Sequence, residues 1–255
     1  MFPIAHGWLL ARLTDGSPSP AAFLGCVWPD MLFGSPLTHQ QSHTSGETLL
    51  DFTREQPDGA GRDALLDFTR GVITHGSAPH GFDWYSDESY GDGGAAKGYA
   101  FQRGAAIATR AAVACGVVEE FGLWKAHNLI EMAFERRLYQ ADPAAAATLR
   151  AACDDTDLMA QIAGPLAQFF HQDAAALAAA MLRYREVVSL APDSLDALAT
   201  IYAAQTRIRH PGATPDADAI ASLIGEAEDI VASDGETYLA ICRAGVRDTL
   251  AALGL

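Results

Sequence analysis

Apolar residues recur along most of this chain every three to four positions, the spacing that marks one face of an α-helix. The alternation of apolar and polar residues that is typical of strands is nearly absent. The pattern therefore predicts an all-α protein. Helices are expected over residues 4–13, 20–33, 63–74, 99–115, 121–140, 143–152, 157–171, 173–190, 193–208, 216–232 and 236–252.

The length of 255 residues suits one large helical domain, and we expect a single domain over residues 1–255. Residues 76–98 are rich in Gly, Asp, Ser and Tyr, and this segment is too long and too aromatic to be a passive linker. We expect a functional loop there. Its aromatic residues either shape a pocket or form the loop's own small core; they are Phe82, Trp84, Tyr85 and Tyr90.

The formal net charge of −15 and the pI near 4.7 oppose binding to long nucleic acids or to an anionic membrane surface, because both need exposed Lys and Arg. No stretch approaches the roughly 18–20 apolar residues of a membrane span. The N-terminus resembles no secretory signal, so a cytoplasmic location is expected. The four cysteines lie far apart without a CxxC pair, which favours buried, reduced thiols.

The histidines carry the candidate chemistry, since six of the eight lie in the first half of the chain. His127 and Glu131 are four positions apart in a predicted helix, which places both on one face within about 5–6 Å, as two ligands of one zinc-like ion. They share the inward apolar stripe of that helix. The alternative is a solvated face on which Glu131 pairs with a nearby basic residue: Lys125, Arg136 or Arg137.

Other candidates have ordinary explanations as well. His6 on the apolar face of a first helix also suits a hydrogen-bonded core histidine. Asp30, a charged residue inside an apolar phrase, needs a partner: a metal, an Arg, or the backbone of a turn that it caps. His39 and His43 are four apart in an expected loop over residues 34–46, and His43 is the preferred ligand.

The order of these residues is His6, Pro29-Asp30, His43, His75 and then His127 with Glu131. This order resembles the zinc-dependent phospholipase C and single-strand-specific nuclease superfamily, in which an all-helical fold holds up to three zinc ions. The resemblance covers roughly residues 1–140, so these form the expected metal-site half. Residues 141–255 are expected to be an Ala-rich scaffold.

Two positions depart from the family pattern. The family has HxxxD where this chain has His75 followed four positions later by Pro79, so the Asp that bridges two zinc ions is missing. Asp83 or Asp87 can replace it from the same loop, and His80 can stand for the family's next His. Secreted members also use the N-terminal amine as a ligand, which here would require an unblocked Met1.

The resemblance implies a zinc-dependent hydrolase of a phosphate ester with one to three zinc or other divalent ions. Asp30 would be both ligand and general base. The implied substrate is a small phosphate ester or a phospholipid head group. The alternative is a non-catalytic helical protein of the same fold, because Pro79 replaces the bridging Asp.

Apolar stripes on the C-terminal helices suit core packing and a homodimer face equally well. No GxSxG, Walker-type or strand-linked GxGxxG motif accompanies the histidines.

Overall fold

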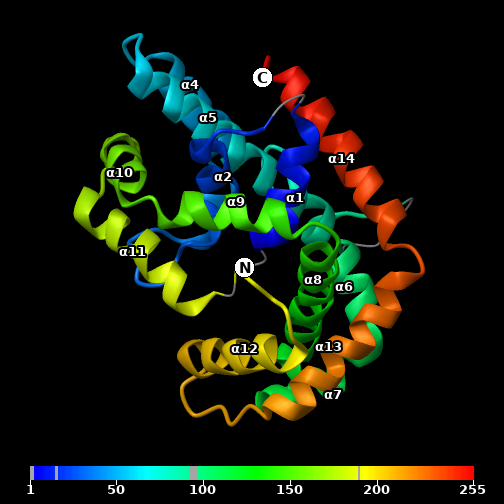
Figure 1. Cartoon of the computed structure of the whole chain (residues 1–255). Helices are drawn as coiled ribbons and strands as arrows, with labels where there is room; N and C mark the ends of the chain where they lie inside the picture. Colours follow the sequence, from blue (N-terminus) through cyan, green and yellow to red (C-terminus); the bar gives the residue numbers. More distant parts are fainter. Residues whose placement is uncertain (1–2, 15–16, 92–96, 189) are drawn as a thin grey trace.

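The apolar stripes fold into helices in a computed structural model of the chain, which describes residues 3–14, 17–91, 97–188 and 190–255 and contains no strand in these ranges. The elements, labelled in part in Figure 1, are α1 (Pro3–Leu13), α2 (Pro20–Val27), η1 (Trp28–Asp30), α3 (His39–His43), α4 (Gly46–Arg54), α5 (Ala60–His75), η2 (Trp84–Glu88), α6 (Tyr99–Gly104), η3 (Ala105–Ile107), α7 (Ala108–Cys115), η4 (Glu119–Phe121), α8 (Gly122–Ala141), α9 (Pro143–Asp154), α10 (Thr156–Phe170), α11 (Ala174–Val187), α12 (Leu195–Arg209), α13 (Ala217–Ala232) and α14 (Gly235–Ala252).

The predicted all-α class is confirmed, and the C-terminal helices begin close to the expected positions. The reason is local, because five of them start at an Asp or Ser whose side chain accepts a backbone N–H of the first turn. These N-cap residues are Asp142, Asp155, Asp173, Ser194 and Asp216.

The expected helices of the first half differ in detail. The helix expected over residues 20–33 ends at Val27 and continues as the short η1, consistent with the missing backbone N–H of Pro29. The expected loop over residues 34–46 contains the short α3, and the helix expected over residues 99–115 is divided by η3. Helix α4 was not predicted.

Two glycines let α2 and α5 touch through their backbones. A Cβ atom at Gly25 would lie 2.0 Å from the carbonyl oxygen of Phe68, and one at Gly71 would lie 2.2 Å from that of Ala22. Any side chain at either position would therefore push the helices apart. Because α2 leads into η1 and α5 ends at His75, this contact sets the distance between Asp30 and His75.

Helix α1 is fixed to α8 by a buried carboxylate. Glu135, which is 2% exposed, accepts hydrogen bonds from the backbone N–H groups of Ile4 (3.0 Å) and Ala5 (2.7 Å) at the start of α1. Burial raises the pKa of Glu135 to about 8, against the effect of these two donors. The bonds hold His6 of α1 beside the inward face of α8.

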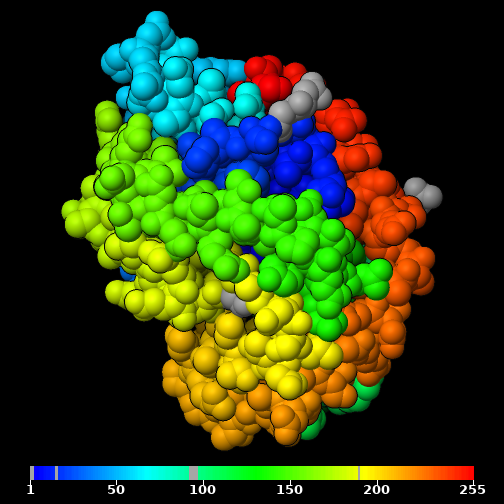
Figure 2. Space-filling view, in the orientation of Figure 1, coloured from blue at the N-terminus to red at the C-terminus, as the bar shows by residue number. Residues whose placement is uncertain are grey.

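One continuous hydrophobic core joins both halves of the chain, so the described residues form a single multi-helix domain. Helix α8 packs against α1, α6, α7 and α13 and contributes the fully buried Leu129, Ile130 and Ala133. Helix α9 (green) crosses the blue α1 and α2 (Figure 2). All four cysteines are buried and unpaired, as expected. Among the described residues, no helix is long and apolar enough to cross a membrane.

An ion pair between α6 and the start of α14 gives a pH-dependent contribution to stability. Asp234 accepts hydrogen bonds from the hydroxyl of Tyr99 (2.6 Å) and from the guanidinium of Arg103. Burial tends to raise the pKa of Asp234, but these two donors outweigh it and lower the pKa below its usual value of 3.8. A lowered folded-state pKa adds stability that is present above the unfolded value and is lost as the pH falls through the folded value.

Replacing Asp234 with Asn should therefore reduce the acid sensitivity of the fold. We expect the wild type to lose about 1 kcal/mol more than D234N in free energy of unfolding between about pH 6 and about pH 3, a value that allows for partial solvent exposure. Urea unfolding followed by circular dichroism at both pH values measures this difference. Equal losses in the two proteins would show that this carboxylate contributes nothing.

Candidate metal centre

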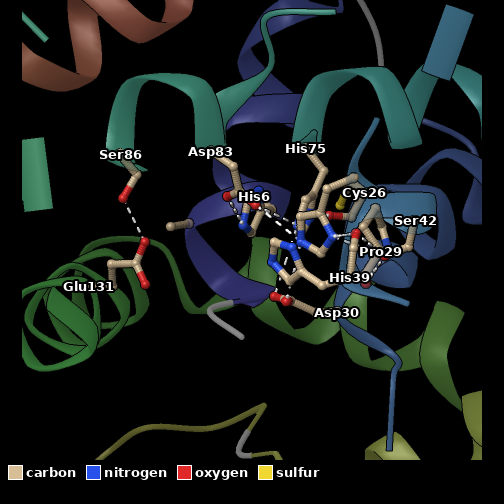
Figure 3. A network of polar contacts seen from close by, with 12 residues as sticks. His6, Cys26, Pro29, Asp30, His39, Ser42, His75, Asp83, Ser86 and Glu131 are labelled. Atoms are coloured by element: carbon tan, nitrogen blue, oxygen red, sulfur yellow. Dashed lines mark hydrogen bonds and ion pairs between the residues drawn. The ribbon is translucent and has the colours of Figure 1, made fainter. Parts of the chain in front are cut away.

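Side chains from distant parts of the sequence meet at one place in the first half of the fold (Figure 3). Helix ends supply several of them, because Asp30, His43 and His75 are the last residues of η1, α3 and α5. They form three adjoining groups whose ligand atoms lie within 4.8 Å of one another in each group. The groups are Asp30, His43 and His75; His6, His75 and Asp83; and Asp87, His127 and Glu131.

The first group joins α3, α5 and η1. His43 Nε2 lies 3.7 Å from Asp30 Oδ1, and His75 Nε2 lies 4.0 Å from Asp30 Oδ2. The two imidazole Nε2 atoms are 3.3 Å apart. All three residues are buried, so these polar atoms face one another away from solvent.

Asp83 connects the first group to the second. Its Oδ2 lies 3.1 Å from His75 Nε2 and 3.3 Å from His43 Nε2, while its Oδ1 lies 3.4 Å from His6 Nε2. Figure 3 shows Asp83 beside His6 and His75. Its two oxygens thus face different imidazoles, which makes Asp83 the candidate for a carboxylate shared by two ions.

The third group lies on α8 and η2. His127 Nε2 is 2.7 Å from Asp87 Oδ1 and 3.3 Å from Glu131 Oε1. The hydroxyl of Ser86 donates to Glu131 Oε1 at 2.6 Å. Both α8 residues face inward as expected, with His127 3% exposed and the Glu131 side chain 14% exposed. The alternative in which Glu131 pairs with a basic residue on a solvated face is not found.

The second nitrogen of three imidazoles is held by an oxygen acceptor. Carbonyl oxygens can only accept hydrogen bonds, so each Nδ1 carries a proton and Nε2, the atom available for a metal, is directed at the carboxylates. Metal-binding histidines are oriented in this way. The contacts are His75 Nδ1 to Cys26 O (2.7 Å), His43 Nδ1 to His39 O (3.0 Å) and His127 Nδ1 to Asn128 Oδ1 (3.1 Å).

The electrostatics of the centre favour a bound cation. Burial lowers the pKa of His43, but the carboxylates Asp30 and Asp83 raise it to about 10. Burial likewise opposes ionisation of Asp30 and Asp83, yet nearby positive charge, to which the imidazoles of His43 and His75 contribute, keeps the pKa of both well below its usual value. The buried carboxylates thus remain charged and need positive charge beside them.

His6 provides an independent sign that a ligand atom is missing a partner. Its side chain is 4% exposed, and its Nδ1 is buried without a hydrogen-bond partner. Burial and the neighbouring His75 hold the pKa of His6 well below 6.5, so the ring is neutral at neutral pH and one nitrogen offers a lone pair. This donor set of imidazole nitrogens and carboxylate oxygens suits zinc.

The loop over residues 76–98 brings two carboxylates to the candidate centre, although position 79 is a proline. Asp83 and Asp87 are four positions apart and both reach the centre, because Trp84–Glu88 forms one turn of π-helix directly after Asp83. Both residues named as possible replacements thus lie among the candidate ligands, and their role as metal ligands stays a prediction. The candidate role of Met1 lies outside the described residues.

His80 is not part of the centre, contrary to expectation. It is exposed, its ring stacks on Trp84 with centroids 3.9 Å apart, and its carbonyl accepts a hydrogen bond from the hydroxyl of Thr249. His39 belongs to none of the three groups either; its ring stacks on His43 at 3.7 Å. The preference for His43 over His39 agrees with this arrangement.

Neither alternative describes the loop aromatics fully, because Phe82 and Tyr90 pack into the main core against rings from outside the loop. Phe82 contacts the rings of His6 and Tyr238, and Tyr90 contacts those of Tyr99 and Tyr238. Phe82 lines a small cavity together with His6 and Glu131, whereas none of the four loop aromatics lines the larger cavity over the other candidate ligands.

That cavity has a volume of about 50 Å³ and is lined by Asp30, His39, His43, Asp83, Asp87, Trp124, His127, Asn128, Glu131 and Arg209. Helix α12 was expected to be scaffold, but it supplies Arg209 to this cavity and Tyr202, whose hydroxyl accepts a hydrogen bond from Asn128 Nδ2 at 2.8 Å. No spacing signal in the sequence marks these two residues, because they reach the centre only through the packing of α12 on α13, which packs on α8.

Compared with protein-family models, curated proteins and solved structures, the chain matches none of them.

Proposed function

We propose that this protein is a metal-dependent hydrolase of a phosphate ester, with zinc as the favoured ion. The observation that carries the proposal is the position of Asp83 between His6, His43 and His75. This carboxylate supplies the bridging position that Pro79 leaves empty in the sequence pattern. It favours a complete ligand set over a degenerate, non-catalytic module.

The three groups would hold up to three ions, and the Nε2 of His75, which the first two groups share, would bind only one of them. Divalent ions there would lower the pKa of a water molecule toward neutrality and would neutralise the charge of a phosphoryl group. Asp30 is ionised at neutral pH and is our candidate for accepting the proton of the attacking water. Asn128 holds His127 in one tautomer, and Ser86 holds Glu131 in place. The expected substrates, a small phosphate ester or a phospholipid head group, stay predictions, as do the cytoplasmic location and any homodimer.

Metal content tests this proposal directly. Tag-free protein purified without chelator should contain two or three equivalents of zinc or a similar ion by inductively coupled plasma mass spectrometry. His127→Ala should lose the ion of the third group, because it removes that group's imidazole. A bound ion present at about 100 times its Kd stabilises the folded protein by about 2.7 kcal/mol per site. Removal of the ions with a chelator should therefore lower the melting temperature.

His80→Ala is the matched control, because His80 is exposed and outside the three groups. It should retain the full metal content and the hydrolysis of p-nitrophenyl phosphate. Wild-type protein that contains no metal and does not change on addition of zinc would contradict the proposal and leave a helical scaffold with packed histidines.

A further inference from the structure

The cavity over the metal ligands is small and carries a strong negative charge. A cavity volume of about 50 Å³ leaves room for about four water molecules. A single tetrahedral phosphoryl group needs about the same room. Four carboxylates line it: Asp30, Asp83, Asp87 and Glu131. Any organic group attached to a phosphoryl group in this cavity must therefore lie outside it.

Arg209 is the one permanently charged cation among the described residues that line this cavity. Its guanidinium lies over the ring of Phe33, with the central carbon 5.4 Å from the ring centroid. A guanidinium presents paired N–H donors that match phosphate oxygens, and it stays charged at every physiological pH. Bound ions would neutralise the carboxylates and leave Arg209 as an additional positive charge toward an anionic substrate.

A chain of buried hydrogen bonds joins the helix of Arg209 to the third ligand group. Tyr202 lies seven positions before Arg209, which is two helical turns on the same face of α12. Its hydroxyl accepts from Asn128 Nδ2 at 2.8 Å, and Asn128 Oδ1 accepts from His127 Nδ1 at 3.1 Å. Arg209 is thus held on a rigid element with a defined relation to His127.

Trp124 provides an apolar surface beside the cavity. Its side chain is 42% exposed although its ring lies 5.5 Å from that of Phe101 and 5.4 Å from that of His127. Trp124 is also one of the cavity-lining residues. An exposed indole next to a phosphoryl-sized cavity suits a planar or apolar group that remains outside.

We propose that Arg209 binds a phosphoryl oxygen of the substrate and that Trp124 contacts its organic group. This inference rests on the proposed function and narrows its substrate class to phosphate esters of planar or apolar groups. It also makes α12 part of the substrate site.

Phosphate binding tests the role of Arg209. Isothermal titration of zinc-loaded protein with inorganic phosphate should show affinity about 10- to 100-fold weaker in Arg209→Gln, because a hydrogen bond to a charged group is lost. Arg207→Gln is the matched control; it makes the same charge change on the same helix, and Arg207 does not line the cavity. Zinc content and melting temperature should be equal in the three proteins.

The outcomes separate this inference from the proposed function. Equal phosphate affinity in the wild type and R209Q would overturn the role of Arg209 and leave the metal centre intact. Wild-type protein that binds zinc but no phosphate would overturn both. Equal weakening in R209Q and R207Q would show a general charge effect and would also overturn the assignment.

A pair of phosphonates tests the role of Trp124. Trp124→Ala should weaken binding of phenylphosphonate about tenfold and leave methylphosphonate unchanged, since stacking on an aromatic ring is worth about 1–3 kcal/mol for a nucleic-acid base. Phe121→Ala is the control, because Phe121 is 43% exposed on a neighbouring turn and does not line the cavity. The same change for both phosphonates, or no change, would overturn the contact with Trp124.

Discussion

Asp83→Asn should remove the ions of two adjoining groups in one substitution. Asp83 lies within 3.4 Å of three imidazole nitrogens, and an amide supplies one neutral oxygen in place of two charged ones. Removal of a residue that only orients a metal ligand lowers metal affinity or activity by about 10- to 100-fold. Loss of a shared ligand should therefore lower phosphoester hydrolysis by more than about 100-fold. Metal content should fall to about one equivalent, because Asp83 belongs to the second group and its Oδ2 also lies 3.3 Å from His43 Nε2 of the first group, whereas the third group consists of Asp87, His127 and Glu131.

Asp87→Asn is the informative comparison. Asp87 lies in the same π-helical turn but belongs only to the third group, so this variant should lose one equivalent of metal and keep the rest. The two variants differ in position by one turn and share the same chemical change. If D83N and D87N lost the same amount of metal, Asp83 would not bridge two groups.

Gly71→Ala should destabilise the fold by about 3 kcal/mol or more, at the upper end of the cost of overpacking. The added Cβ would lie 2.2 Å from Ala22 O and 2.5 Å from the backbone nitrogen of Cys26, and neither backbone atom can move without separating α2 from α5. Separation would also stretch the hydrogen bond from His75 Nδ1 to Cys26 O, so zinc affinity should fall together with stability. Urea unfolding and metal titration measure the two effects.

Gly61→Ala, in the same helix α5, is the control for helix propensity. Gly61 is exposed and has no neighbouring atom within 4 Å of an added Cβ, so this substitution should stabilise the protein by about 0.5–1 kcal/mol. A similar small gain for G71A would contradict the close backbone contact between α2 and α5.

The structure explains why ligands as distant as His6 and Glu131 can be held together. Glu135 connects α8 to the start of α1, and the Gly25 and Gly71 contact connects α2 to α5. These contacts are separate from the ligand atoms, so the centre is organised before any ion binds. Preorganisation of this kind lowers the entropic cost of binding.

Much of the local structure was predictable from the sequence. The helices that begin at Asp142, Asp155 and Asp173 follow from caps and apolar periodicity, which act over one or two turns. The pair of His127 and Glu131 was predictable for the same reason, because a spacing of four residues has one geometry in a helix.

The sequence by itself thus determined the all-α class, most helix positions and a set of candidate ligands in the first half of the chain. Only the tertiary structure decided that Asp83 lies between three histidines, that His80 is outside the centre, and that Arg209 of α12 lines the cavity. Helical periodicity and caps are short-range interactions that neighbouring residues specify. The centre depends on contacts between residues far apart in sequence, and no local pattern records which helix ends will meet.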